Sequence, residues 1–186
     1  MTQARTVAVL VGSLRKASLS RKIAHALAAL APDNLTLKIV EIGDLPHYNQ
    51  DLEEEGPVPA AWTEFRQAVS AADAVLFVTP EYNRSVPGAL KNAIDVGSRP
   101  YGKSAFNAKP AAVLSQSPGA LAAFGANHHL RQSLVFLNMP VLQQPEAYVG
   151  ASATLFDESG ELVKDDTRAF FTTFMAAFAA WIEKTA

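Results

Sequence analysis

The sequence predicts a doubly wound α/β sandwich, in which five parallel strands form one sheet with helices on both faces. Short apolar runs that end at glycine, proline or a polar residue alternate with segments whose apolar residues recur at helical spacing. The chain has 186 residues, of which 49% are hydrophobic, and this is enough to bury one sizeable core. We therefore expect residues 1–186 to form a single domain.

The first strand and the first helix illustrate both patterns. Residues 7–11 are a continuous apolar run that ends at Gly12, which is typical of a strand buried on both faces of a parallel sheet. In residues 19–30, Ile23 and Leu27 lie on one helical face. A β-α unit is therefore expected at the start of the chain.

The later elements repeat this alternation. Residues 35–42 alternate as an edge strand does, and phenylalanines at 170, 174 and 178 recur every four residues, as in a helix packed on a core. In chain order, we expect a strand over 35–42, a helix over 60–71, a strand over 74–78, a helix over 87–96, a strand over 111–114, a helix over 121–137, a strand over 141–142 and a helix over 169–182.

Strands joined by helical crossovers predict a topology. Such crossovers are right-handed and cover both faces of a parallel sheet. For five strands we expect the order 2-1-3-4-5, with ligands bound at the carboxyl ends of the strands, between strands one and three. Residues 43–59 and 97–109 exceed the usual connection of about two to six residues and are candidates to border a site or an interface.

Composition excludes several classes of function. With 16 basic and 18 acidic residues, the net charge of -2 gives no broad field for binding nucleic acid or a membrane. The chain has no cysteine, which excludes disulfides, thiolate catalysis and iron–sulfur clusters. His128 and His129 are adjacent on a predicted helix and point in different directions, so no metal site is expected. No export signal is recognised, and a cytoplasmic location is expected.

The turn after the first strand has the features of an anion-binding site. The start of a helix offers unpaired N–H groups and about half a positive charge. Hydroxyl and guanidinium donors lie in the same turn, at Ser13, Arg15, Ser18 and Ser20. The pattern favours a phosphate monoester; the alternative is that Ser18 only caps the helix and Arg15 is solvated.

A stiff loop follows the third strand. An aromatic ring and an amide beside exposed backbone N–H groups can lie along a flat heterocycle. The residues concerned are Pro80, Glu81, Tyr82 and Asn83. The alternative is an ordinary turn in which Pro87 starts the next helix.

A third loop, residues 115–119, follows the fourth strand. Here Ser117 and Gly119 can direct backbone N–H groups at a ring carbonyl. By itself this loop indicates little. With the expected strand order, however, all three loops meet at one edge of the sheet, which favours a shared ligand.

Four motifs in these regions combine into a specific resemblance. They are Gly-Ser-Leu-Arg at 12–15 with Ser18 and Ser20, Pro-Glu-Tyr-Asn at 80–83 with Ser-Val-Pro-Gly at 85–88, Leu-Lys-Asn-Ala-Ile-Asp at 90–95, and Ser117-x-Gly119. Together they resemble the NADPH-dependent FMN reductase family over most of the chain, and are most similar to its bacterial quinone, chromate and azo-dye reductases. The resemblance implies a flavodoxin-like fold.

The resemblance also implies roles for the candidate residues. Ser13, Arg15, Ser18 and Ser20 would hold the phosphate of non-covalently bound FMN, Pro80, Glu81, Tyr82 and Asn83 would line the isoalloxazine ring, and Ser117 and Gly119 would approach its pyrimidine end. The chain departs from the family at Phe124-Gly125-Ala126, where members often carry paired glycines.

The family further implies partners. NADPH or NADH would be the reductant, with Arg84 and Lys103 as candidates to contact a 2′-phosphate. A homodimer or homotetramer is implied, for which Arg131 and Glu146 are a candidate pair between subunits. The acceptor would be a small molecule.

The sequence therefore predicts an FMN-dependent NAD(P)H oxidoreductase that passes electrons in a ping-pong cycle to quinones or to similar acceptors, such as azo compounds, chromate or free flavin. No side chain is expected to act as catalyst, because the flavin carries the chemistry. One alternative is a flavodoxin-like electron carrier that binds FMN without a substrate of its own. Another is a phosphate binder or hydrolase on the same fold.

Overall fold

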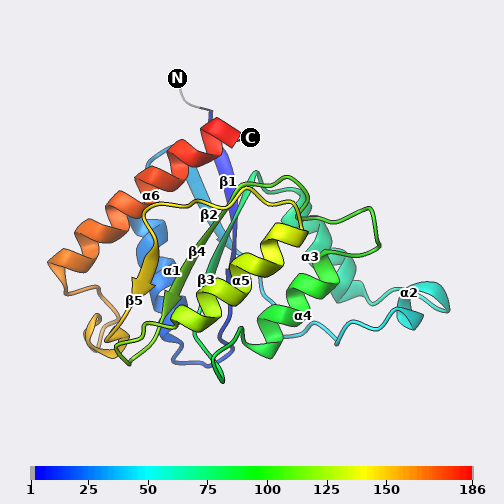
Figure 1. Cartoon of the computed structure of the whole chain (residues 1–186), viewed down its shortest axis with the longest axis horizontal. Helices are drawn as coiled ribbons and strands as arrows, with labels where there is room; N and C mark the ends of the chain where they lie inside the picture. Colours follow the sequence, from blue (N-terminus) through cyan, green and yellow to red (C-terminus); the bar gives the residue numbers. More distant parts are fainter. Residues whose placement is uncertain (1–2, 186) are drawn as a thin grey trace.

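The computed structural model describes residues 3–185 and contains one five-stranded parallel sheet (Figure 1). The strands lie in the order β2-β1-β3-β4-β5, so the predicted order is confirmed. Their bounds are Arg5–Val11 for β1, Leu35–Ile39 for β2, Ala74–Thr79 for β3, Ala111–Gln116 for β4 and Ala147–Val149 for β5.

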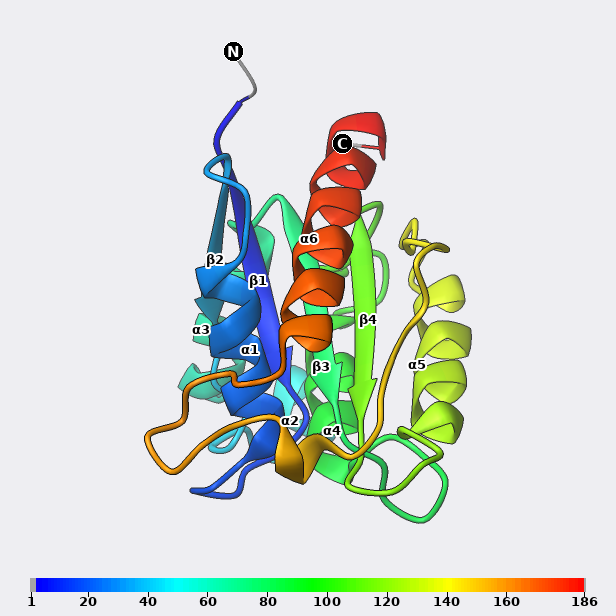
Figure 2. The same cartoon turned by 90° about the vertical axis from the view of Figure 1, so that its left-hand side faces the viewer.

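Helices cover both faces of the sheet (Figures 1 and 2). Helices α1 and α6 lie on one face, and α3, α4 and α5 lie on the other. The α-helices span Leu19–Ala29 (α1), Asp51–Glu54 (α2), Ala60–Ser70 (α3), Gly88–Gly97 (α4), Phe124–Phe136 (α5) and Asp165–Thr185 (α6), with a 3-10 helix at Ser152–Thr154.

The central strands are apolar because both of their faces are covered. All six residues of β3 are buried, whereas β2 at the sheet edge alternates between buried and more exposed residues. Alternate side chains of β1 enter different cores: Val9 packs in the cluster that contains Phe174 and Phe178 of α6, and Leu10 in the cluster that contains Trp62 of α3. The sheet therefore separates two hydrophobic layers.

The prediction for the fifth strand is wrong. It was expected over 141–142, but β5 lies at Ala147–Val149 and pairs with the end of β4. Val141 makes only an isolated parallel bridge to Ala111. Pro145 lies between the two contacts and has no N–H to donate to a ladder, so the chain meets β4 twice with an interruption between.

Two helices begin at other residues than expected. Helix α5 starts at Phe124 and not at 121, because Ala122 and Ala123 have φ angles of 51° and 60°, outside the helical region. Helix α6 starts at Asp165, before the apolar repeat that predicted it. An acidic residue in the first turn of a helix is stabilised by the helix dipole.

Residues 51–55 are an acidic run, for which charge alone predicts a solvated surface; Glu53 departs from that prediction. Its carboxylate lies 2.6 Å from Arg66 Nη1, with only 9% of the Glu53 side chain exposed. The hydroxyl of Tyr48 donates to Glu53 at 3.1 Å, and burial together with this carboxylate raises the pKa of Tyr48. The pair ties the long connection after β2 to α3.

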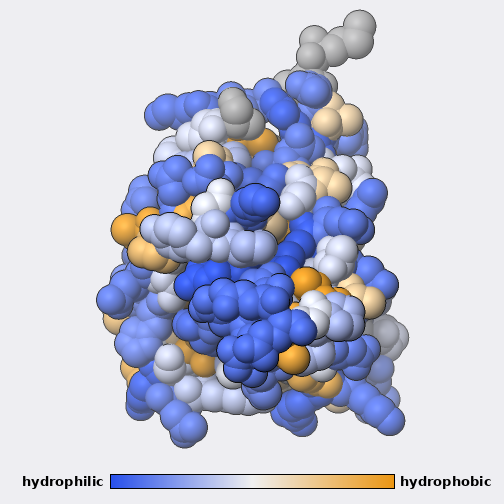
Figure 3. All heavy atoms as spheres, turned by 90° about the vertical axis from the view of Figure 1, so that its right-hand side faces the viewer, coloured by the Kyte–Doolittle hydropathy of each residue, from blue (hydrophilic) through white to orange (hydrophobic). Residues whose placement is uncertain are grey.

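The outer surface beside α2, α3 and α4 is mostly hydrophilic, with hydrophobic side chains in small separate areas (Figure 3). Within residues 3–185, none of the helices combines the length and apolar character that crossing a membrane requires.

Candidate functional site

The turns that follow β1, β3 and β4 lie together at the carboxyl edge of the sheet, the lower end in Figures 1 and 2. The N–H of Gly12 donates to Val78 O, at the end of β3, at 2.9 Å. A Cβ on Gly12 would lie 2.9 Å from Thr79 Oγ1 and 3.2 Å from Pro80 Cδ. The first turn can therefore pass the second only because residue 12 has no side chain.

The turn 12–18 presents the start of α1 to this edge. Ser18 is the N-cap, and its Oγ accepts from Arg21 N–H at 3.1 Å. The earlier N–H groups of a helix have no partner within the helix, and α1 has no acidic residue in its first turn. Ser13 is buried and Arg15 is exposed. Ser18 thus caps α1, as the alternative interpretation expected, while the helix start still suits an anion.

Ser20 is fully buried beneath this turn. Its hydroxyl accepts from Gln116 Nε2 at 2.8 Å, and Gln116 Oε1 accepts from Ser152 Oγ at 2.6 Å. The network joins α1, the end of β4 and the segment after β5. Sequence analysis missed Gln116 and Ser152; a polar residue at the end of an otherwise apolar strand was the only signal.

The loop after β3 is a miniature hairpin. Tyr82 and Ser85 exchange backbone hydrogen bonds of 3.1 and 2.9 Å, and Asn83 and Arg84 between them have φ angles of 50° and 63°. Positive φ at both central residues is the geometry of a type I′ turn. The hairpin holds Tyr82 half-exposed, with 51% of its surface accessible, at the edge of the sheet.

Glu81 points from this hairpin to α5. Its Oε2 accepts from Ala126 N–H at 3.0 Å, and its Oε1 lies 3.2 Å from Arg84 Nη1. A Cβ on Gly125 would lie 2.8 Å from both Arg84 O and Glu81 Oε2. The glycine of Phe124-Gly125-Ala126 is therefore the residue that lets α5 approach the hairpin.

The loop after β4 turns back on itself. Ser117 Oγ accepts from Gly119 N–H at 3.1 Å, and Ser117 O accepts from Ser152 N–H at 3.2 Å. A Cβ on Gly150 would lie 3.4 Å from Gly119 O, so this loop packs closely against the chain after β5. Ser117 and Gly119 thus lie at the same edge as the first two loops.

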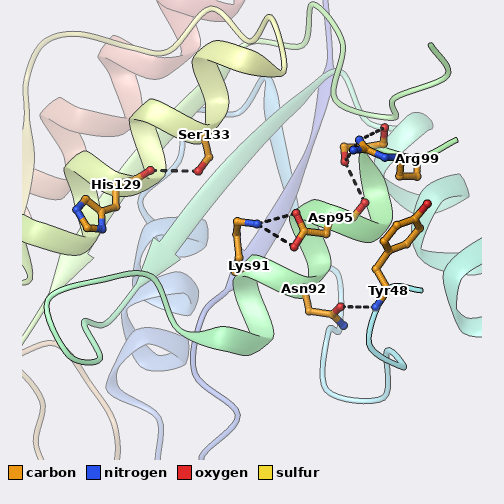
Figure 4. Close-up of polar contacts among 8 residues, drawn as sticks. Tyr48, Lys91, Asn92, Asp95, Arg99, His129 and Ser133 are labelled. Atoms are coloured by element: carbon orange, nitrogen blue, oxygen red, sulfur yellow. Dashed lines mark hydrogen bonds and ion pairs between the residues drawn. The ribbon is translucent and has the colours of Figure 1, made fainter. Parts of the chain in front are cut away.

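A fourth segment, the beginning of the connection 43–59, joins this edge through α4. Figure 4 shows Asn92 of α4 directed at Tyr48: Asn92 Oδ1 accepts from Tyr48 N–H at 2.8 Å. Asn92 Nδ2 donates to Leu45 O and Pro46 O at 3.2 and 3.1 Å. This explains the asparagine of the 90–95 motif, to which sequence analysis gave no role.

The other long connection, 97–109, leads from α4 to the start of β4 and therefore lies toward the opposite, amino edge. Of the two expected possibilities, a site or an interface, this connection therefore does not border the site at the carboxyl edge, and Lys103, which it carries, lies away from the three turns. Arg84, by contrast, is in the hairpin after β3, where it pairs with Glu81.

An aromatic cluster stands beside the start of α5. The rings of Phe124 and His128 are 4.2 Å apart, and those of Phe124 and Tyr148 are 5.4 Å apart. The Tyr148 hydroxyl lies 2.9 Å from His128 Nε2 and donates to Glu146 Oε1 at 2.8 Å. Burial of the phenol, with this hydrogen bond to Glu146, raises the pKa of Tyr148 to about 12.

The suggested pair between Arg131 and Glu146 has other partners in this chain. Arg131 Nε donates to Asn127 Oδ1 at 2.9 Å, and its Nη1 donates to Leu142 O at 3.0 Å. Glu146 accepts from Tyr148. Both side chains are therefore held within the subunit.

The other candidates for a site are a metal centre and a cavity beside α3. Among residues 3–185, no group of three or more histidine, aspartate or glutamate side chains is placed to hold a metal ion. A cavity of about 560 Å³ lies between α3 and β2, and its lining combines apolar side chains with Lys38, Glu41, Asp44 and Glu64. Its lining residues include Leu45 of the connection after β2 but do not belong to the turns after β1, β3 and β4.

The residues at the carboxyl edge fit a phosphorylated flat ligand such as FMN. The start of α1 offers N–H groups and no opposing carboxylate, and Gly12 leaves the space for a tight turn beside it. Tyr82 provides an aromatic face nearby. In the loop after β4, the N–H groups of Ser117 and Gly119 donate to Val149 O and Ser117 Oγ, so both are already paired within the chain. Fold and site thus define a flavodoxin-like FMN-binding protein.

Comparisons with known proteins identify the family. The sequence model of the NADPH-dependent FMN reductases matches residues 5–154. A quinone reductase from Pseudomonas putida is 63% identical over 183 residues, covering 98% of this chain and 97% of its own. A 2-hydroxy-1,4-benzoquinone reductase from a Burkholderia species is 44% identical over 176 residues, covering 95% of both chains.

A solved structure agrees with these sequences. The flavoenzyme NAD(P)H:(acceptor) oxidoreductase FerB from Paracoccus denitrificans superposes with a TM-score of 0.91 at 42% identity, covering 98% of this chain and 99% of its own. The chain belongs to the NADPH-dependent FMN reductase family. It is an oxidoreductase that uses FMN and a reduced nicotinamide, as the sequence predicted.

Proposed function

We propose that this enzyme reduces quinones with electrons from NADPH or NADH, through FMN held at the carboxyl edge of the sheet. The observation that carries the acceptor class is the pair of relatives named for quinone reduction, at 63% and 44% identity over nearly the whole chain. Azo compounds, chromate and free flavin are further candidate acceptors, since an open flavin edge discriminates little between them.

The predicted site residues keep their proposed roles, except that the Glu81 carboxylate is held by Ala126 N–H and Arg84 and so acts beside the ring and not on it. The phosphate lies at the start of α1, the ring along the hairpin after β3, and the pyrimidine end against the loop after β4. Support comes from the meeting of these three segments at one edge. The residues of the phosphate turn are Ser13, Arg15, Ser18 and Ser20. Those of the hairpin are Pro80, Glu81, Tyr82 and Asn83, and those of the loop after β4 are Ser117 and Gly119.

FMN, when bound, supplies hydride acceptance and electron transfer, so the chain's own residues need only bind, orient and shield. The start of α1 and Arg15 hold the phosphate. Ser20 is fully buried and its oxygen accepts from Gln116, so it would support the phosphate turn from beneath. Tyr82 covers one side of the proposed ring site and leaves the other side open. The nicotinamide and the acceptor would occupy this open side in turn, which predicts ping-pong kinetics.

Anaerobic stopped-flow mixing tests the proposal. Excess NADPH should bleach the visible absorbance of the FMN-loaded protein, and a following pulse of 1,4-benzoquinone should restore it. Steady turnover with no second protein present separates an enzyme from an electron carrier. An unbleached spectrum, or bleaching without turnover of the quinone, would refute quinone reductase activity.

The remaining assignments are also proposals. We propose that residues 1–186 act as one FMN-binding unit, that the enzyme works in the cytoplasm, where NAD(P)H is available, and that it forms a homodimer or homotetramer. Val135 and Phe136 support an assembly, because 76% and 73% of their surfaces are exposed at the end of α5. Light scattering of Val135→Ser and Phe136→Ser variants would show whether this end of α5 holds subunits together.

A further inference from the structure

Helix α5 has no cap of its own. Its N-cap residue, Ala123, is in the left-handed region and has no side chain that could accept a hydrogen bond. A helix start with unsatisfied N–H groups is costly when it is partly buried. The partner that satisfies Ala126 N–H must therefore come from elsewhere in the chain.

That partner is Glu81, which lies 45 residues earlier in the sequence and accepts from Ala126 N–H at 3.0 Å. Only 12% of the Glu81 side chain is exposed, and its other oxygen is held by Arg84 Nη1. The carboxylate also lies at the positive end of the α5 dipole. Gly125 leaves room for this contact, because a Cβ there would collide with Glu81 Oε2 and Arg84 O.

A second contact joins the same two elements one turn later. Ser85 Oγ lies 3.0 Å from His129 Nδ1 on α5. Glu81 and Ser85 stand on either side of Tyr82 and Asn83 in the hairpin. The direction in which the hairpin presents its tyrosine is therefore set by α5, whose start also ends the loop that carries Ser117.

We propose that Glu81 is a positioning residue, which sets the separation of the hairpin after β3 from the start of α5 and the loop that precedes it. This rests on the proposed placement of the FMN ring between those two loops. With the contact in place, the two loops already stand at this separation before the cofactor binds. Without it, FMN binding must also order the hairpin, and affinity falls.

In this role Glu81 acts through α5 and does not itself contact the ring. A direct contact would depend on the charge or hydrogen-bonding of Glu81 itself and not on Gly125. A positioning role depends on Glu81 and on Gly125, because these two residues determine the distance between the hairpin and α5. Loss of this positioning affects only the ring end of the cofactor, so the affinities for FMN and for riboflavin should fall by the same factor.

Titration of FMN and of riboflavin into the apoprotein, followed by flavin fluorescence, tests this with four variants. We expect Glu81→Ala to weaken both flavins roughly tenfold, the scale of one hydrogen bond to a charged group. Glu81→Gln retains an oxygen that can accept from Ala126 N–H and should stay within about threefold of the wild type. Gly125→Ala should reproduce the loss with Glu81 intact. Glu64→Ala, at an exposed position of α3, is the control.

A second readout separates positioning from a loss of fold stability. Visible circular dichroism of flavin-saturated protein should change in Glu81→Ala and Gly125→Ala, whereas mere destabilisation lowers the melting temperature and leaves that spectrum unchanged. The proposal would be overturned if Glu81→Ala and Gly125→Ala both kept the flavin affinity and the spectrum of the wild type. It would also be overturned if Gly125→Ala bound flavin normally while Glu81→Gln bound it weakly. If the wild type itself bound no FMN, the placement of the cofactor would fail as well, and the first titration would reveal it.

Discussion

The starts of α1 and α5 lie at the same edge of the sheet, yet they are completed in different ways. Helix α1 is capped by Ser18, the residue immediately before it, and its approach needs Gly12. Helix α5 is capped by Glu81 from another loop, and its approach needs Gly125. The local cap leaves the α1 turn self-contained, whereas the remote cap couples α5 to the hairpin after β3.

This difference agrees with the proposed placement of FMN, in which the two helices serve different ends of the cofactor. A self-contained helix start with a flexible arginine nearby suits a phosphate, which needs donors and positive charge. A helix that is clamped to a neighbouring loop suits a rigid ring, which needs walls at a defined separation. Substitutions at these residues test whether α1 serves the phosphate and α5 the ring.

The largest effect is expected from Gly12→Ala. The added Cβ would lie 2.9 Å from Thr79 Oγ1, so the turn must shift, with a loss of about 1–3 kcal/mol in the free energy of unfolding. FMN affinity should fall at least about tenfold, because the donors of the α1 turn move with it. Urea denaturation measures the free energy of unfolding, and flavin titration measures the FMN affinity.

Gly88→Ala is the matched control for this change, since nothing lies within 4 Å of a Cβ at residue 88. If Gly12→Ala folds and binds FMN as Gly88→Ala does, the α1 turn does not hold the phosphate.

Arg15→Ala should affect binding without affecting folding, because Arg15 is exposed. We expect the preference for FMN over riboflavin to fall roughly tenfold, as one charge-assisted hydrogen bond to phosphate is lost. Parallel titrations with the two flavins measure it, with exposed Lys16→Ala as control. An equal loss for both flavins would place Arg15 at the ring and contradict the division.

Ser18→Asp separates the two tasks of the cap. Aspartate caps a helix about as well as serine, so the free energy of unfolding of the apoprotein should change by less than about 0.5 kcal/mol. Its negative charge should repel the phosphate and weaken FMN several-fold while riboflavin is unaffected. Unchanged FMN affinity would mean that the phosphate lies away from Ser18.

The smallest effect concerns Tyr148, whose ring packs beside the first turns of α5. Its pKa of about 12 lies above the ordinary value of about 10, so the stability that it contributes is present below pH ~10 and is lost as the pH rises through ~12. In an absorbance titration, Tyr148→Phe should lack the component that ionises near this upper value. Tyr101→Phe, at an exposed ring, should retain it; loss of the component there would contradict the assignment.

Local sequence patterns were sufficient to predict most of the strands and helices of this protein. Continuous apolar runs identified the central strands, because strands covered on both faces carry mainly apolar side chains, and the helical repeats identified the helices that cover them. Ser18 could be recognised as a cap, and Gly12 as the end of a strand, because each acts on its immediate neighbours. The motifs also led to the family that the comparisons then identified.

Tertiary structure decided what depends on residues far apart in the chain. The last strand formed at Ala147–Val149 and not at 141–142, since pairing is set by which backbone groups can reach β4 and not by apolar content. The roles of Asn92, Gln116 and Glu81 are likewise invisible in the sequence, because each side chain bonds a segment brought beside it only by the closure of the sheet. Sequence by itself therefore determined the class of fold and the three turns proposed to hold the cofactor, and the packed structure determined how those turns are held against one another.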